Sequence, residues 1–265
     1  MLMTILGEDQ NQTSTNTTEY EYHVTELLSD GRIKWEMSMT RFIIESDDMQ
    51  GNVKAFDTQD PDRDTSDKQV QLYDKMVGVP MYMTSKQDGQ ILEFSGANAL
   101  FDKIMQAFKD KPEMASMANS IKKTFGDSAM LESVRNMWGY LPAKPVRVGD
   151  KWRTIREQSG IMSQTTESVY KLKSRDAHTA TIATKSTSKP TPGKSSGWDM
   201  GGIKIEYDLS GGGSGSTIVT QPDGILMSGK HSVTMKGMMY MSGDKIDKMD
   251  VPITIKVTVL TELIR

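Results

Sequence analysis

Cysteine is absent from this 265-residue sequence, and its absence removes several kinds of chemistry at once. A chain without thiols has no disulfides, no thiolate metal ligands, no cysteine nucleophile and no cysteine that could carry a lipid. Histidine is nearly as rare, since only His23, His178 and His231 occur, far apart and in no shared motif. Residues 193–197 have the spacing Gly-x-Ser-x-Gly but lie in a segment rich in Pro, Gly and Ser and not at a strand-to-helix elbow, and no His-Glu-x-x-His motif is found. We therefore expect no catalytic residues and no cofactor, and we predict that the protein is not an enzyme.

An excess of one charge and long apolar runs are also missing. The 32 Lys and Arg residues nearly balance the 35 Asp and Glu residues, which leaves a net charge of -3. No element gathers Lys and Arg along one side, and this argues against nucleic acid as a partner. No stretch approaches the roughly 18 apolar residues of a membrane-spanning helix. The apolar opening, residues 1–7, is too short for a signal peptide. We expect neither a transmembrane nor a signal segment in this chain.

What the sequence does contain is a regular alternation of apolar and polar residues. It runs through Tyr20–Val24, Ile33–Met39, Ile203–Leu209 and Val251–Val259. Alternation with period two is typical of strands in antiparallel sheets that have one polar face. Beyond Met39 the apolar positions change from odd to even numbers, and this shift predicts a β-bulge near residues 40–41.

Helical periodicity is confined to two parts of the chain, about residues 64–78 and residues 97–139. Ser66 and Gln69 have the spacing of a capping box that would open the first helix. The second part contains three amphipathic patterns in series, each with a single apolar stripe. A helix with one apolar stripe covers another element, so we expect these helices to pack on the apolar face of a sheet.

Together these patterns predict an α+β fold built mainly on an antiparallel, strongly curved β-sheet, open or closed halfway to a barrel, with a helical insert on its apolar face. The polar and aperiodic residues 7–18 predict that the first 18 residues form a disordered leader. We expect one domain after it, in three parts: a first β segment with one helix over 19–96, the helical insert over 97–139, and a second β segment over 140–265.

Two segments that resemble ligand-binding loops lack the residues such loops require. Five Asp residues crowd residues 57–67, but a calcium loop counted from Asp60 would need Gly and Glu where Thr65 and Gln71 stand. The Gly-rich segment 210–216 lacks the Lys-Ser/Thr ending of a phosphate loop and leads into a strand. Its glycines more simply permit a bend or a close approach of neighbouring backbones. We expect no metal ion at the acidic loop and no phosphate at the Gly-rich segment.

Methionine is unusually frequent, with 21 residues, several of them in Met-x-Met pairs on expected strands. Because alternate residues of a strand share a face, Trp35, Met37 and Met39 point to one side, as do Met81 and Met83. Thioethers can bind Cu(I), but no Cys or clustered His accompanies them, so we expect no copper. Met also fills irregular cores or lines apolar surfaces that adapt to their contents. We predict that these five residues line a groove for an apolar ligand, and ordinary core packing stays open.

Two parts of the chain carry a resemblance to known proteins. Phe56–Leu100 combines an Asp-rich loop, a short helix and a hairpin, and Leu141–Trp152 ends in the motif Val-Gly-Asp-Lys-Trp. From about residue 20 onward the chain resembles a family of uncharacterised bacterial cell-envelope proteins, a domain of unknown function often carried behind a signal peptide or lipoprotein anchor. It is broadly similar to lipoprotein-carrier-like folds with a curved sheet. The resemblance implies a periplasmic or outer-surface location and carries over no catalytic residue.

These observations lead to three hypotheses on function. In the first, this is a non-enzymatic bacterial envelope protein that binds an apolar small molecule or a protein partner in the concavity of its sheet. The alternative is a structural or scaffolding domain with a filled core and no ligand. A hydrolase comes third, because it would require a cleft with paired carboxylates. An apolar cavity would favour the first hypothesis and a packed interior the second.

Overall fold

The computed structural model describes most of the chain and is built mainly from antiparallel strands. The described residues are 2–5, 8–47, 53–87, 89–106, 126–158, 162–194, 196–200, 202–221, 224–243 and 246–264. Within these ranges it has fourteen strands, arranged in two sheets, and three helices. The antiparallel β character and the small helical portion that we predicted are confirmed. The strong curvature of the sheet stays a prediction.

The chain divides into two compact units, which are described separately. The N-terminal unit comprises residues 10–134, and the C-terminal unit comprises residues 1–9 with 135–265. The boundary at residues 134 and 135 falls inside a helix, α4 (Asp127–Trp138). That residues 19–265 form a single domain stays a prediction.

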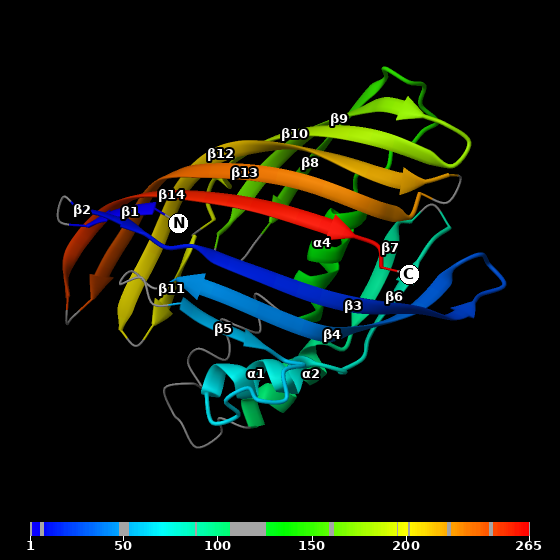
Figure 1. Ribbon diagram of the computed structural model, residues 1–265. Helices are drawn as coiled ribbons and strands as arrows, with labels where there is room; N and C mark the ends of the chain where they lie inside the picture. The colour runs from blue at the N-terminus through cyan, green and yellow to red at the C-terminus, as the bar shows by residue number, and fades with distance from the viewer. Residues whose placement is uncertain are drawn as a thin grey trace. The chain divides into compact units, whose positions relative to one another are not determined.

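The N-terminal unit contains a five-stranded sheet in the order β3-β4-β6-β7, with β5 paired to β4 (Figure 1). Its strands are β3 (Ser14–Leu27), β4 (Ile33–Asp47), β5 (Val53–Asp57), β6 (Met81–Ser85) and β7 (Ile91–Ser95). The register between β3 and β4 passes from Glu19 opposite Arg41 to Tyr20 opposite Met39, so that Thr40 is an extra residue. The predicted β-bulge is therefore confirmed, and it turns Phe42 to the same face as Met39.

The first helix of the N-terminal unit is shorter than the periodicity suggests. This helix, α1 (Lys68–Met76), begins later than residue 64 because Asp64 accepts hydrogen bonds from the amide and hydroxyl groups of Ser66 in a turn. Tyr73 on α1 stacks on Phe42 of β4 with 4.0 Å between ring centroids, which places this helix against the sheet. The second, α2 (Ala97–Gln106), is joined to the start of α4 by Asn98 and Asp127, which lie 2.7 Å apart. The middle helix expected between them lies outside the described residues.

The C-terminal unit is dominated by a nine-stranded sheet in the order β2-β1-β14-β13-β12-β10-β9-β8, with β11 paired to β12. Figure 1 shows its long central strands side by side. The strands are β1 (Leu2–Ile5), β2 (Glu8–Asn11), β8 (Lys151–Gln158), β9 (Gln164–Arg175), β10 (Thr179–Pro190), β11 (Gly197–Met200), β12 (Ile203–Thr220), β13 (Leu226–Gly243) and β14 (Ile246–Glu262).

The segment expected to be a disordered leader contains strands. Leu2 and Met3 pair with Ile253 and Thr254 of β14, and Ser14 to Thr18 pair with β4. Thr is abundant in this segment and fits a pleated strand well, and the neighbouring strand supplies the backbone hydrogen bonds. Regular structure here thus depends on a pairing partner far along the chain and not on an apolar period within the segment.

Two apolar clusters occupy the two ends of one face of the nine-stranded sheet. Leu209, which is fully buried, lies at the centre of the first cluster with Ile205, Met239, Val251 and Ile253. The second cluster consists of Tyr140, Tyr170, Leu172, Ala180, Ile182 and Val219. Between them the central strand β12 carries glycines in place of large side chains.

The glycines of β12 allow neighbouring strands to approach closely. A Cβ atom on Gly213 would collide with the backbone oxygen of Ser232, and one on Gly211 would collide with that of Thr234. A Cβ on Gly215 would meet the imidazole ring of His231. The predicted role of this segment in a close backbone approach is confirmed.

Candidate functional site

The five residues predicted to form an apolar groove lie together on one face of the N-terminal sheet. Trp35 is paired with Met83, and Met37 with Met81, across the β4–β6 ladder. Met39 follows on the same side of β4. The exposed fractions of the four Met residues are between 3% and 7%, so their side chains are packed and not open to solvent.

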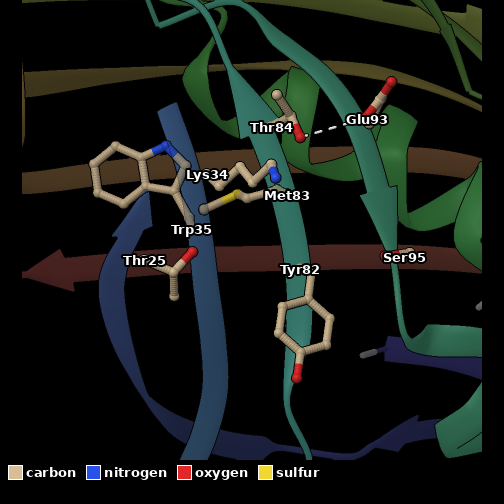
Figure 2. A pocket seen from close by; sticks show the side chains of 8 residues that line it. All are labelled: Thr25, Lys34, Trp35, Tyr82, Met83, Thr84, Glu93 and Ser95. Atoms are coloured by element: carbon tan, nitrogen blue, oxygen red, sulfur yellow. Dashed lines mark hydrogen bonds between the residues drawn. The ribbon is translucent and has the colours of Figure 1, made fainter. Parts of the chain in front are cut away.

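A cavity of about 210 Å³ lies beside part of this group in the N-terminal unit. Figure 2 shows the residues that line it, which are Thr25, Lys34, Trp35, Tyr82, Met83, Thr84, Glu93 and Ser95. Of the five residues predicted to line an apolar groove, only Trp35 and Met83 are among the described residues that line this cavity. Its lining is largely polar, and the indole N–H of Trp35 donates to the Ser85 hydroxyl at 2.9 Å. The Thr84 hydroxyl donates to Glu93 at 3.3 Å.

A larger cavity, of about 380 Å³, lies in the C-terminal unit, and most of its lining residues are of apolar type. One side is formed by residues 141–146, which contain two prolines and connect α4 to the sheet; with Tyr140 we call this segment the strap. The opposite side consists of residues from β9, β10 and β12, each buried almost completely: Leu172, Ala180, Ile182 and Val219. We call this cavity the strap pocket. The sequence predicted neither its position nor its lining.

Hydrogen bonds at Tyr140 fix the start of the strap. The Tyr140 hydroxyl donates to the carbonyl oxygen of Gly224 at 3.2 Å, and burial raises the pKa of this phenol to about 12. The indole N–H of Trp152 donates to the carbonyl oxygen of Tyr140 at 3.2 Å. Trp152 also stacks on Tyr170, with 5.6 Å between ring centroids. These contacts indicate that Trp152 anchors the strap to the sheet, and Trp152 also lines the strap pocket.

The charged side chains at the strap pocket are both cations. Lys144 lies on the strap and Arg175 ends β9, and both are exposed. Neither forms an ion pair with any residue that the structure describes. The nearby carboxylate of Asp176 is occupied within its own turn, where it accepts hydrogen bonds from the amides of His178 and Thr179, each at 2.7 Å.

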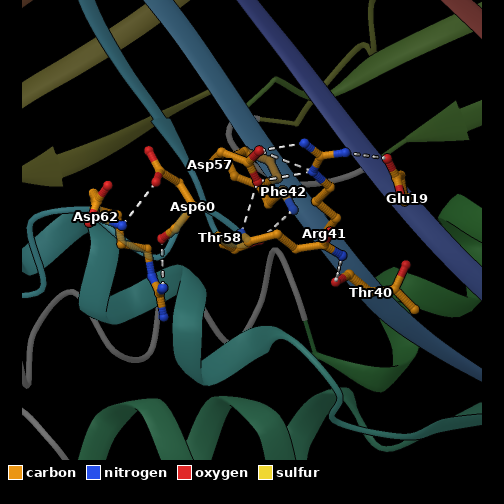
Figure 3. Close-up of polar contacts among 10 residues, drawn as sticks. Glu19, Thr40, Arg41, Phe42, Asp57, Thr58, Asp60 and Asp62 are labelled. Carbon is orange, nitrogen blue, oxygen red and sulfur yellow. Dashed lines mark hydrogen bonds and ion pairs between the residues drawn. The ribbon is translucent and has the colours of Figure 1, made fainter.

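The acidic loop, residues 57–67, forms an ion pair and turn hydrogen bonds within the N-terminal unit. Figure 3 shows Arg41 between Asp57, at 2.5 Å, and Glu19, at 3.4 Å. The Arg41 guanidinium, followed by the amide of Gln59, lowers the pKa of Asp57 from 3.8 to about 2. Asp60 accepts a hydrogen bond from the amide of Asp62 at 2.9 Å. Among the described residues, no group of three acidic or histidine side chains is placed to hold a metal ion.

The histidines do not combine into a site in the described structure. His231 lies against Gly215 on β12, and its Nε2 is 2.9 Å from the hydroxyl of Thr217. His231 is half-buried in the sheet, and burial lowers its pKa. His23 lies 3.2 Å from Glu21 on the exposed strand β3, and His178 is in a turn.

Comparison with known proteins places this architecture in a family. The sequence pattern described as "Family of unknown function (DUF6263)" matches residues 30–226, which is most of the chain. The chain belongs to this family. The part of the predicted resemblance that concerned a domain of unknown function is thereby confirmed, whereas the envelope location and the carrier-like fold stay predictions. Searches of curated proteins and of solved structures found no match.

The DUF6263 match includes every residue that lines the strap pocket. The family description assigns no activity to this region. Within the part of the chain that the structure describes, no helix is long and apolar enough to cross a membrane.

Proposed function

We propose that this protein is a non-catalytic binding protein that takes an apolar molecule into the strap pocket. The observation that carries the proposal is the cavity of about 380 Å³ between the strap and the buried apolar residues of β9, β10 and β12. Binding sites for small molecules typically have volumes of about 300–1,000 Å³ and apolar walls with a few polar groups. The strap pocket has this size and this composition.

The walls of the strap pocket are held in place without a ligand. Leu172, Ile182 and Val219 belong to paired strands, and each is less than 5% exposed. The strap is fixed at Tyr140 by two hydrogen bonds and is stiffened by Pro142 and Pro145. A preformed site loses less conformational entropy on binding than one that must first be ordered. This rigidity supports a binding role for the pocket.

The lining of the strap pocket supports a role without catalysis. Its polar side chains include Lys144, Arg175, Thr220 and Gln221, and the described part of its lining contains neither a histidine nor a carboxylate. General acid–base catalysis most often relies on those groups. We further propose a location in the bacterial cell envelope, which is supported only by the resemblance that Phe56–Leu100 and Leu141–Trp152 carry.

The Met residues of the N-terminal unit favour a structural role for that unit. Met37, Met39, Met81 and Met83 are packed nearly to completion, as expected for residues that fill a core. We therefore propose that the N-terminal unit serves as a scaffold. The predicted groove at these residues becomes the second candidate for the apolar site, with Trp35 and Met83 at its adjacent cavity.

Ala180→Leu tests the strap pocket directly. Ala180 lines the cavity and is 4% exposed, so a larger side chain there should extend into the empty space. Because the cavity accommodates the added atoms, we expect a change in unfolding free energy below about 1 kcal/mol, less than the usual cost of overpacking. Binding of Nile red, a neutral apolar dye, should be saturable in the natural protein and weakened at least tenfold in this variant.

Ala183→Leu is the matched control, because Ala183 is three residues further along β10 and on the opposite face. It adds the same atoms outside the pocket and should leave dye affinity unchanged. Equal dye affinity in both variants would move the site away from the strap pocket, and Trp35→Ala would then examine the second candidate. Absence of saturable binding to the natural protein would favour the scaffold alternative for the whole chain.

A further inference from the structure

We infer that the ligand of the strap pocket is an anionic amphiphile, whose acidic head group lies between Lys144 and Arg175 and whose apolar tail enters the pocket. This inference rests on the proposed function, since it names the class of ligand for the same site. It follows from the distribution of charge around the pocket.

The two cations come from separate parts of the C-terminal unit and meet at one cavity. Lys144 belongs to the strap, and Arg175 is the last residue of β9, yet both line the same pocket. Among the residues that the structure describes, the rest of the lining includes no Asp or Glu. The chain as a whole is slightly acidic, so two cations without a described anion beside them depart from its average.

The cations are also available to a ligand. Some cations elsewhere in this unit are paired with carboxylates, as Arg153 is with Glu167 and Lys194 with Glu157. Lys144 and Arg175 have no such partner among the described residues, and the adjacent Asp176 is committed to the backbone of its turn. A guanidinium and an ammonium group without partners bind carboxylate or phosphate oxygens through charge-assisted hydrogen bonds.

The apolar floor accounts for the other half of the ligand. Leu172, Ala180 and Ile182 line the same pocket as the cations, are buried and offer no hydrogen-bonding side chain. An inorganic anion would satisfy the cations but leave this surface unused, and a neutral hydrocarbon would leave the cations unused. A molecule with an acidic head and an apolar tail is complementary to both parts.

The experiment compares probes that share a chain length and differ in charge. Binding of dodecanoate, dodecyl phosphate, dodecanol and dodecyltrimethylammonium to the intact protein is measured by displacement of Nile red, below the concentration at which each probe aggregates. We expect both anions to bind about tenfold more tightly than dodecanol, a difference of about 1.4 kcal/mol. The advantage should shrink as salt is raised, because exposed charges are screened over about 8 Å at physiological ionic strength.

The variant Lys144→Gln with Arg175→Gln should remove the preference for anions and leave dodecanol affinity unchanged. Lys236→Gln with Lys256→Gln is the matched control, because both lysines are exposed on β13 and β14 and lie outside the pocket lining. It changes the net charge by the same amount and should retain the preference. Unfolding curves of both variants establish that they are folded, and the comparison of probes on the natural protein requires no variant.

Each outcome separates this inference from the proposed function. Equal affinities for the anions and dodecanol, or the tightest binding by the ammonium probe, would overturn the anionic ligand and leave apolar binding intact. Failure of all four probes and of the dye would overturn both proposals. Binding to phosphatidylglycerol vesicles without binding of the single-chain anions would also refute the inference, because the recognised object would then be a membrane surface.

Discussion

Replacing Trp152 by Ala should strongly destabilise the C-terminal unit, because this residue joins the strap to the sheet. Its indole stacks on Tyr170 and packs against the apolar cluster that includes Leu172 and Ile182. Its N–H donates to the carbonyl oxygen of Tyr140, where the strap begins. The substitution removes the ring contact, the apolar packing and this hydrogen bond together.

The size of the effect follows from these contacts. Truncation of a buried Trp to Ala costs about 3–5 kcal/mol, and the partial exposure of Trp152 places it near the lower end, at roughly 3 kcal/mol. Trp152→Phe keeps a ring that can stack on Tyr170 but loses the hydrogen bond, which contributes about 1 kcal/mol. We therefore expect Phe at this position to cost less than half as much as Ala.

Urea unfolding followed by circular dichroism measures both variants. With a slope of roughly 1–3 kcal/mol per molar urea, a loss of 3 kcal/mol lowers the midpoint by about 1–3 M. The slope itself should stay constant if the surface exposed on unfolding is unchanged. A Trp152→Ala protein with the midpoint of the natural protein would refute the anchoring role and leave Trp152 as a ligand contact only.

Two further predictions concern close packing and pH. Gly213→Ala should lower the unfolding free energy by about 1–3 kcal/mol, because the added methyl group would overpack this position. In Gly229→Ala the nearest new contact would be an ordinary 3.6 Å, so the unfolding free energy should change by less than about 0.5 kcal/mol. Equal thermal midpoints for the two variants would contradict the close approach of the strands at Gly213. Because Arg41 lowers the pKa of Asp57 from 3.8 to about 2, the stabilisation by this pair is complete above the unfolded value and is lost as the pH falls through about 2. The stability of Asp57→Asn should lack this acid dependence, and an unchanged acid titration would show that the pair contributes nothing.

The sequence predicts the long strands of this protein well because their alternation is set by burial on one face. Val251 and Ile253, on the odd positions of β14, are buried, whereas Pro252 between them is exposed. The bulge at Thr40 is readable for the same reason, since a change in apolar parity requires an extra residue in the ladder. Where one face of a strand is buried, the alternation of apolar and polar residues indicates the strand.

Strands without a buried face lack this alternation and cannot be predicted from it. Ser188 pairs with Gly211, and Ser14 pairs with Ser46, but neither segment shows an apolar period. Residues 186–202 are rich in Pro, Gly and Ser, a composition typical of a loop, although β10 continues to Pro190 and β11 follows at Gly197. Their strand conformation is decided by partners that are distant in sequence, which no local pattern reveals.

The strap pocket escaped prediction for a related reason. Its walls come from residues 141–146, from the ends of β9 and β10, and from residues 219–221 with Gly224, and only the register of three strands brings these together. Pro142 and Pro145 were the available signal, since two prolines after a helix indicate a stiff connection that cannot join the sheet. Methionine is the most unusual feature of the composition, and it therefore points to the Met pairs as a binding site and not to the strap.

The contrast between the Met pairs and the strap pocket bears on what kind of binding this fold supports. Flexible Met side chains suit a surface that adapts to its ligand, and here they are packed in the N-terminal unit. Leu172, Ile182 and Val219 line the strap pocket. Ile182 and Val219 are branched at Cβ, and their rotamers are therefore restricted. Walls of this kind select ligands by shape, because they cannot rearrange around a poorly fitting one. The residues that line the pocket have already lost their conformational entropy on folding. Binding therefore need not order the protein, and differences in contact with these walls would decide which ligand binds.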